Sequence, residues 1–282
     1  MLLVSCCGED GSLFAVNEKT THIKKVFPSS CTGIVQSPNG DIFVYSHPLR
    51  SICVFERNFV MKRHKEVGHN FHCLFLFENN LYAMDTYNDK LIAYDTFTLE
   101  EKFHWDFGVN HSGERFNDLY HINDVFIVGN TMLISMFRDK YDSNIEFYGD
   151  SGKVYVKCLH DLSTSFGGIF TQGLTQPHSP FLYGDEFYVC NSKESSIVVG
   201  KFRHGIVPTL DKREEIQIGD GFTRGLLVTA EKIYVGISNS VRRTTEEFKD
   251  VQCGITIIKR STMKKQFIPL PASEVYGILK YE

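Results

Sequence analysis

The sequence predicts an all-β protein, a six-bladed β-propeller with four antiparallel strands in each blade. Three observations predict this fold class: a turn-plus-strand unit that recurs five times, strand signals without convincing helical periodicity, and chain ends that together supply one more set of four strands. Four antiparallel strands per repeat are typical of a propeller blade. An ordinary β-sandwich, or two separate β-domains, is the alternative fold.

The recurring unit is a tight turn followed by an apolar strand. The apolar strands of its five copies begin at Ile42, Leu81, Met132, Phe187 and Ile233. The intervals between these starts are 39, 51, 55 and 46 residues, close to the roughly 40–50 residues of a blade. A third apolar strand such as KLIAYD and a more polar fourth strand such as EEIQIG follow. We therefore expect blades at about 31–68, 69–108, 119–174, 175–220 and 221–271.

The two chain ends supply the sixth blade. The segments LLVSC, SLFAVN and HIKKVF match the second, third and fourth strands of a blade, and VYGILKY near the C-terminus matches the first strand. Pairing of residues 272–282 with residues 1–30 would close the ring and remove an open sheet edge. The sequence thus predicts one propeller domain over residues 1–282.

The bulk composition favours a globular protein. The 282 residues are 42% hydrophobic and 23% charged, and the net charge of −4 gives no reason to expect nucleic acid as a partner. No apolar run reaches the roughly 18 residues of a membrane span, so we expect no membrane partner. The opening MLLVSCCGEDG lacks the basic region of a signal peptide, and the eight cysteines include no CxxC motif. We therefore expect free thiols and a cytoplasmic location.

One position recurs nine residues before each apolar second strand. It is occupied by Gly33, His72, Asn123, His178 and Arg224. In a propeller these positions lie at the start of the innermost strands, so we expect the side chains to surround one mouth of the central channel. Prolines flank the segment around His178 in TQPHSP and restrict its backbone.

The same face would also carry the long loops between strands. Long loops gathered on one face of a rigid scaffold often carry function. Polar side chains from these loops and from the adjoining strand ends are further candidate ligand-binding residues: Asp85, His121, Asp124, Arg138, Asn191 and Arg242.

Two kinds of chemistry remain open for these residues. His72 and His178, with Asn123 or Asp124, could bind a divalent metal ion as a cofactor. Alternatively, Arg224, Arg138 and Arg242 could bind an anion. His178 and His72 would then act as general acid and base, and Asp124 could orient an imidazole. A purely structural role, in which these side chains bond only the backbone and water, is the third interpretation.

The segments QPHSP (176–180), TRGL (223–226) and HINDV (121–125) carry a resemblance to known proteins. The chain resembles an uncharacterised family of six-bladed propellers with a Q-P-H-S-P motif, and more broadly the NHL and SMP-30/gluconolactonase type. The lactonases of that type hold a divalent cation with acidic and amide residues, including an early glutamate. This chain has Thr32 and Gly33 at the early position, which departs from that pattern.

These observations predict that a small polar molecule, anionic and carbohydrate-like, is bound at the channel mouth and chemically processed there. The enzyme class would be lyase, isomerase or hydrolase, with His178 and His72 in proton transfer and Arg224 holding the anion. The alternative is a propeller without catalytic activity that docks another protein. Exposed apolar patches on the loop tips would favour docking, and converging His and Arg side chains would favour an enzyme.

Overall fold

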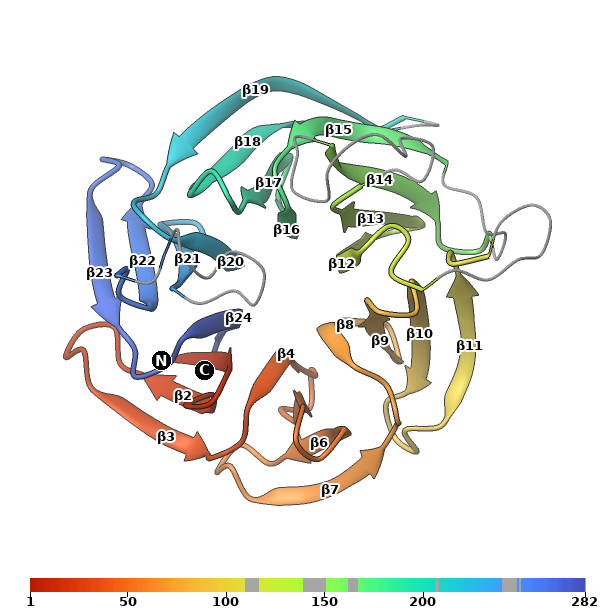
Figure 1. The fold of residues 1–282 in the computed structure, drawn as a ribbon, viewed down its shortest axis with the longest axis vertical. Coiled ribbons are helices and arrows are strands. Elements are labelled where there is room, and N and C mark those ends of the chain that lie inside the picture. The colour runs from red at the N-terminus through yellow and green to blue at the C-terminus, as the bar shows by residue number, and fades with distance from the viewer. Residues whose placement is uncertain are drawn as a thin grey trace. The chain divides into compact units, whose positions relative to one another are not determined.

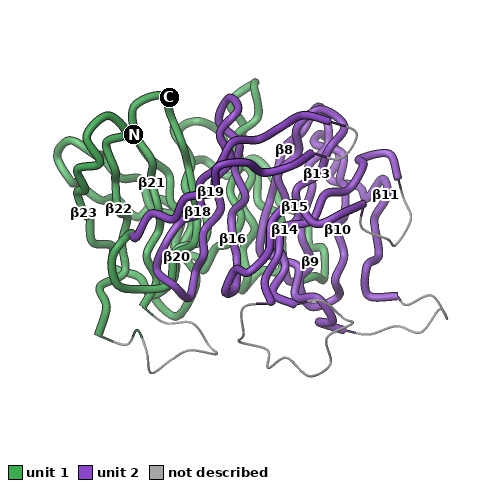
Figure 2. Tube along the Cα trace, turned by 90° about the horizontal axis from the view of Figure 1, so that it is seen from above, with its two compact units in different colours: residues 1–69, 218–282 green, residues 70–217 purple. Residues whose placement is uncertain are grey.

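The computed structural model describes residues 1–109, 117–138, 151–161, 167–205, 208–239, 248 and 250–281. Within these ranges the chain forms 24 strands, and no helix there could cross a membrane. The strands belong to two compact units, unit 1 (residues 1–69 and 218–282) and unit 2 (residues 70–217), which Figure 2 shows in different colours. Six four-stranded antiparallel sheets, three in each unit, confirm the predicted fold class of an all-β, six-bladed β-propeller (Figure 1).

Unit 1 contains three sheets, each with its strands in sequential order apart from the C-terminal strand. The first sheet is β24 (Glu274–Lys280), β1 (Leu2–Cys7), β2 (Leu13–Val16) and β3 (Ile23–Phe27). The second is β4 (Cys31–Gln36), β5 (Ile42–Ser46), β6 (Ser51–Phe55) and β7 (Met61–Glu66). The third is β20 (Phe222–Val228), β21 (Lys232–Ser238), β22 (Gly254–Lys259) and β23 (Lys265–Pro269).

The two ends of the chain share one sheet, as the sequence predicts. β24 pairs antiparallel with β1, and the register places Leu2 opposite Lys280 and Val4 opposite Ile278. The C-terminal strand is therefore the first strand of the blade whose other three strands come from the N-terminus. This pairing removes the open edge that β1 would otherwise present.

Unit 2 is continuous in sequence and also contains three sheets. The first is β8 (Phe71–Phe77), β9 (Asn80–Asp85), β10 (Lys90–Asp95) and β11 (Glu101–Asp106). The second is β12 (Ile122–Val128), β13 (Thr131–Met136), β14 (Gly152–Cys158) and β15 (Gly168–Leu174). The third is β16 (Pro177–Tyr183), β17 (Glu186–Asn191), β18 (Ser196–Arg203) and β19 (Thr209–Gln217).

The place of a strand in its sheet follows from its sequence. Second and third strands such as β5 (IFVYS) and β6 (SICVF) are mainly apolar and are buried along their whole length. The fourth strand β7 (MKRHKE) alternates partly buried and exposed residues, which is the pattern of a strand with one solvated face. It forms the outer edge of its sheet, where charged side chains discourage pairing with other chains.

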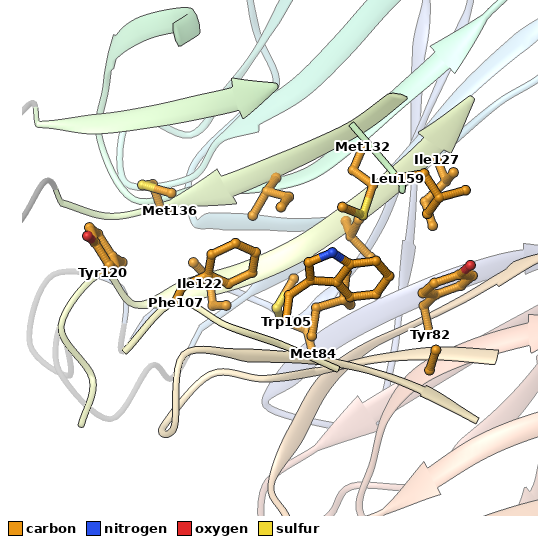
Figure 3. Close-up of a cluster of buried hydrophobic side chains, with 14 residues drawn as sticks. Tyr82, Met84, Trp105, Phe107, Tyr120, Ile122, Ile127, Met132, Met136 and Leu159 are labelled. Atoms are coloured by element: carbon orange, nitrogen blue, oxygen red, sulfur yellow. The ribbon is translucent and has the colours of Figure 1, made fainter. Parts of the chain in front are cut away.

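One buried core cluster of unit 2 lies between its first two sheets and is shown in Figure 3. Trp105 of β11 and Tyr82 of β9 belong to it, with Met132 of β13 from the neighbouring sheet. The indole N–H of Trp105 donates to the carbonyl of Asp161 at 2.9 Å, which satisfies the one polar group of that side chain. Tyr120 and Ile122, which flank His121 in the chain, are also buried in this core.

Each first strand carries a β-bulge against the second strand of its sheet. The residues left out of the register are Thr32 and Gly33 in β4, His72 in β8, Asn123 in β12, Ser179 and Pro180 in β16, Gly225 in β20 and Tyr276 in β24. A bulge bends a strand and re-aims the side chains beside it. Gly225 has a φ of 72°, a conformation that glycine adopts without a steric penalty.

The bulged strands of each unit are neighbours. In unit 2, β12 packs against β8 and against β16. In unit 1, β24 packs against β4 and against β20. The bulges include the recurring positions Gly33, His72 and Asn123, and directly follow His178 and Arg224. The recurrence seen in the sequence therefore corresponds to a repeated backbone irregularity.

Candidate functional site

Four ring side chains form a row in unit 2, here called the ring row. The imidazole of His72 meets that of His121 edge to face, with centroids 6.1 Å apart. His121 stacks on Phe137 at 4.4 Å, and Phe137 meets His178 edge to face at 5.1 Å. His72 lies on β8 and His178 on β16, while His121 precedes β12 and Phe137 follows β13. Three neighbouring blades thus contribute to one row.

His178 is buried, and its hydrogen bonds define its tautomer. Its Nδ1 lies 3.0 Å from the carbonyl oxygen of Gln176 and 2.9 Å from the hydroxyl of Ser192. A carbonyl can only accept, so Nδ1 carries the proton and donates it to Gln176. The lone pair of the neutral ring is therefore on Nε2, which can act as a base or as a hydrogen-bond acceptor.

The backbone around His178 is held in an unusual conformation. Gln176 and Ser179 both have a φ of 53°, which non-glycine residues rarely adopt. Asp124 of the neighbouring blade accepts a hydrogen bond at 2.8 Å from the backbone N–H of Ser179. The sequence suggested that Asp124 could orient an imidazole. In the structure its carboxylate holds the main chain of the segment that carries His178.

His121 is paired with a carboxylate that the sequence reasoning missed. Its Nδ1 is hydrogen-bonded to Asp118 Oδ1, and both side chains are largely buried. An ionised carboxylate only accepts, so Nδ1 donates the proton and Nε2 becomes the basic nitrogen of the neutral ring. His121 and His178 consequently share one arrangement: Nδ1 donates to an acceptor, and Nε2 carries the lone pair of the neutral ring.

Two buried amide side chains lie beside these histidines in the sequence. Asn123 donates from Nδ2 to the carbonyl of His121 at 3.0 Å, which fixes the orientation of its amide. The other amide atom, Oδ1 of Asn123, is buried and has no hydrogen-bond partner among the described residues, and the same holds for Nε2 of Gln176. Buried polar atoms in proteins are usually satisfied. Oδ1 of Asn123 therefore calls for a donor, and Nε2 of Gln176 calls for an acceptor.

Three other predicted site residues bind neighbouring protein groups. Asn191 accepts from the backbone N–H of Thr175 at 2.6 Å and donates to Glu215 at 2.9 Å. Asp85 is fully buried and accepts from the amide of Asn88 at 2.7 Å. Arg138 donates to the carbonyls of residues 118 and 119. The structure places Asn191 beside the His178 segment and Arg138 beside the His121 segment.

Arg224 lies in unit 1 and has a carboxylate partner there. Its Nη1 is 3.3 Å from Glu274 Oε2, and its guanidinium lies over the rings of Tyr276 at 4.2 Å and Phe222 at 5.1 Å. Burial raises the pKa of the Tyr276 hydroxyl. The positive charge of Arg224 is therefore balanced within unit 1 by Glu274. Arg242, the remaining predicted anion ligand, lies outside the described residues.

The donor set does not match the calcium site that the lactonase resemblance implies. Calcium takes six to eight oxygen ligands, among which carboxylates are prominent. The ring row presents imidazole nitrogens and a phenyl ring, and Thr32 and Gly33 stand at the early position. In the part of the chain that the structure describes, no group of three or more His, Cys, Asp or Glu side chains is arranged to hold a metal ion.

The sequence contained signals for some of the missed residues. Phe137 and Ser192 both directly follow the second strand of a blade and both contact His178. Phe137 is apolar, and an apolar residue at the end of a strand does not by itself indicate a site. Tyr276 precedes a glycine, as Thr32 and Arg224 do in the segments TGI and RGL. An alignment of the three x-Gly pairs would have found Tyr276.

Comparisons with known proteins concern the fold. Residues 158–279, less than half of the chain, match a family described as a domain of unknown function, DUF4915. No curated protein matches the chain in sequence. A protein of unknown function from Bacteroides caccae is similar in structure, with 11% identity, a TM-score of 0.68 and coverage of 98% of this chain and 97% of that one.

Two further solved structures are similar at low identity. The calcium-binding protein regucalcin from Agrobacterium tumefaciens is 12% identical, with a TM-score of 0.60 over 86% of this chain and 75% of that one. A proposed 6-phosphogluconolactonase from Bacteroides fragilis is 11% identical, with a TM-score of 0.61 over 99% and 96%. At these identities the likeness shows the fold alone, that of a β-propeller, and in sequence residues 158–279 are similar to DUF4915.

Proposed function

We propose that unit 2 binds a small, polar, carbohydrate-like molecule beside the ring row and processes it by proton transfer. The observation that carries the proposal is the shared arrangement of His121 and His178. Each imidazole is buried, and each Nδ1 is tied to an acceptor, Asp118 or the carbonyl of Gln176. Two basic Nε2 atoms on one row suit general acid–base catalysis, in which one ring removes a proton and the other supplies one.

The buried amides support a hydroxylated ligand. Oδ1 of Asn123 needs a donor, and Nε2 of Gln176 needs an acceptor. A hydroxyl group can serve either atom, and sugars present several hydroxyls on a compact frame. The name of the similar Bacteroides fragilis protein, a proposed 6-phosphogluconolactonase, makes sugar lactones and sugar acids reasonable first ligands. We infer that the Q-P-H-S-P segment serves to hold Gln176 and His178 in this site.

The described arginines give less support to the anionic part of the prediction. Glu274 balances the charge of Arg224, and Arg138 donates to two backbone carbonyls. Protonation of His121 or His178 is another source of positive charge at the ring row. The charge of the ligand is therefore an outcome of the test, which compares neutral and anionic sugars of similar size.

The test is ligand binding by the full chain with D-glucose, glucono-δ-lactone, gluconate and 6-phosphogluconate as probes. Thermal shift and isothermal titration would measure binding, and NMR of the probe would detect its conversion. We expect at least one probe to bind, and binding to be lost in His178→Gln and in His121→Gln. The matched control is His104→Gln, because Nδ1 of His104 also pairs with a carboxylate, Glu101 at 2.8 Å, but the side chain is 43% exposed on β11.

Two results would contradict the proposal. One is that none of the four probes binds at millimolar concentration to the folded protein. The other is that binding survives in both His121→Gln and His178→Gln, or is lost equally in His104→Gln. The docking alternative draws no specific support, since the large apolar residues exposed among the described ones, such as Val60, Phe97 and Ile169, belong to different blades.

A further inference from the structure

A buried carboxylate holds the main chain of the segment that carries His121. Asp89 follows strand β9 and is fully buried. Its Oδ2 accepts hydrogen bonds from the backbone N–H groups of Leu119 and Tyr120, and its Oδ1 accepts from Ile122 at 3.3 Å. Three backbone donors within residues 119–122 thus converge on one side chain.

The carbonyl groups of the same segment are held from the other side. Arg138 donates from Nε to the carbonyl of Leu119 at 2.8 Å and from Nη2 to that of Asp118. The backbone N–H of Phe137 donates to the carbonyl of Tyr120 at 3.2 Å. An acidic side chain on the N–H groups and a basic side chain on the carbonyls leave the segment little freedom.

The side chains of the segment divide between the core and the ring row. Tyr120 and Ile122 belong to the buried core of unit 2 (Figure 3). His121, between them, stacks on Phe137, and its Nδ1 pairs with Asp118. A shift of this short stretch of main chain would therefore move the imidazole relative to Phe137 and to Asp118 together.

Closing the turn after β9 does not require the side chain of Asp89, whose backbone N–H donates to the carbonyl of Thr86 at 3.3 Å. That turn already has a buried carboxylate, Asp85, which accepts from the side chain and the backbone of Asn88. Lys90, the next residue, pairs with Asp106 at 3.3 Å, so it has a partner of its own. Burying a second carboxylate costs free energy unless hydrogen bonds compensate for the water that it loses. The bonds of Asp89 go to the His121 segment.

We propose that Asp89 is a positioning residue. Through the backbone N–H groups of residues 119, 120 and 122, it fixes the position of the Asp118–His121 pair relative to the other members of the ring row. Its consequence for catalysis rests on the proposed function, whereas the positioning itself does not. Arg138 completes the clamp from the carbonyl side. Neither side chain needs to touch a ligand for this role.

The test is NMR spectroscopy of the ligand-free full chain, wild type and Asp89→Asn. The variant keeps the shape of the side chain but has one acceptor oxygen in place of two. We expect the amides of residues 119, 120 and 122 to lose protection from hydrogen exchange by about tenfold or more. The imidazole signals of His121 should shift, while those of His104 stay in place.

Asp85→Asn is the matched control, because it removes an equally buried carboxylate at the start of the same turn. The backbone N–H groups of residues 119, 120 and 122 keep their hydrogen bonds to Asp89 in this variant. Unchanged His121 signals in Asp89→Asn, or an equal shift in Asp85→Asn, would overturn the proposal. Should Asp89→Asn not fold, the wild-type protein still tests it: exchange of these amides as fast as that of exposed loop amides would also overturn it. A shifted His121 without any sugar binding would leave Asp89 its role and remove the proposed function.

Discussion

Asp124 accepts a hydrogen bond at 2.8 Å from the backbone N–H of Ser179, 55 residues further along the chain. The bond joins the bulge of β12 to the bulge of β16, where Asp124 is buried and Ser179 is partly buried. It ties the segment that carries His178 to the blade that carries His121. The relative position of the two imidazoles therefore depends on a contact between two bulges.

Removal of this acceptor should be costly. In Asp124→Ala, the N–H of the partly buried Ser179 loses its carboxylate partner, and we expect a loss of about 1–3 kcal/mol in the free energy of unfolding. Asp124→Asn keeps an acceptor oxygen and should lose less. Urea denaturation of the two variants measures the difference, and equal losses would show that the hydrogen bond is not the cause.

Asp89 should make stability depend on pH. Burial raises the pKa of its carboxyl group from 3.8 to about 7, although the three backbone donors lower it. The folded state then binds more protons than the unfolded state between pH 4 and 7, so the free energy of unfolding falls as the pH rises through that range. The slope is at most about 1.4 kcal/mol per pH unit.

The variant Asp89→Asn removes this titration. We expect wild type to lose stability relative to the variant between pH 4.5 and pH 7.5, as measured by urea denaturation at both values. Parallel stability curves for the two proteins would show that the pKa of Asp89 is not raised. A gain of wild-type stability with rising pH would show that the backbone donors outweigh burial.

Glu18 should contribute stability with the opposite dependence on pH. Partial burial raises the pKa of its carboxyl group, but hydrogen bonds from Lys232, Lys280 and Tyr234 outweigh it and lower the pKa from 4.5 to about 2. The stabilisation is complete above pH 4.5 and is lost as the pH falls towards 2.

The corresponding variant is Glu18→Gln. The two lysines are about one third exposed, so solvent screening reduces the effect, and we expect a loss of about 1 kcal/mol at pH 7. The difference from wild type should vanish near pH 2. Glu231→Gln, at an exposed neighbouring position, is the control in urea denaturation. A loss that persists unchanged at pH 2 would contradict the assignment to the carboxylate.

Only one of the eight cysteines should react rapidly in the folded protein. Cys158, at the end of β14, is exposed, and the other seven are buried or half-buried. Burial raises the pKa of Cys53 to about 11 and that of Cys253 to about 12, which suppresses the reactive thiolate. With a chromogenic disulfide reagent at pH 8, we expect one fast equivalent, absent in Cys158→Ser. Two or more fast equivalents would contradict the burial of the rest.

The fold could be predicted from the sequence because its signals are local. Turn residues and the apolar strands that begin at Ile42, Leu81 and Met132 recur within each blade, and each blade needs only its own strands to be recognised. The pairing of β24 with β1 could be predicted by elimination, since the ends supplied complementary strands.

The site was less predictable because its contacts are not local. The count of nine residues found His72 and His178, but Phe137, which contacts both His121 and His178, follows a second strand in an apolar context. Asp118 lies in an irregular segment before β12, which the residue count from the second strands does not reach. Arg224 was expected to hold an anion, and no spacing rule indicated its pairing with Glu274, 50 residues away.

The pairing of β24 with β1 sets an order of events during synthesis. All twelve strands of unit 2 come from consecutive residues 70–217 and can assemble as the ribosome delivers them. Unit 1 cannot finish until residues 274–280 have emerged, and one edge of β1 stays open while the strands from β4 to β23 are made. That edge of β1 is thus protected only after all the strands of the other five sheets have been made.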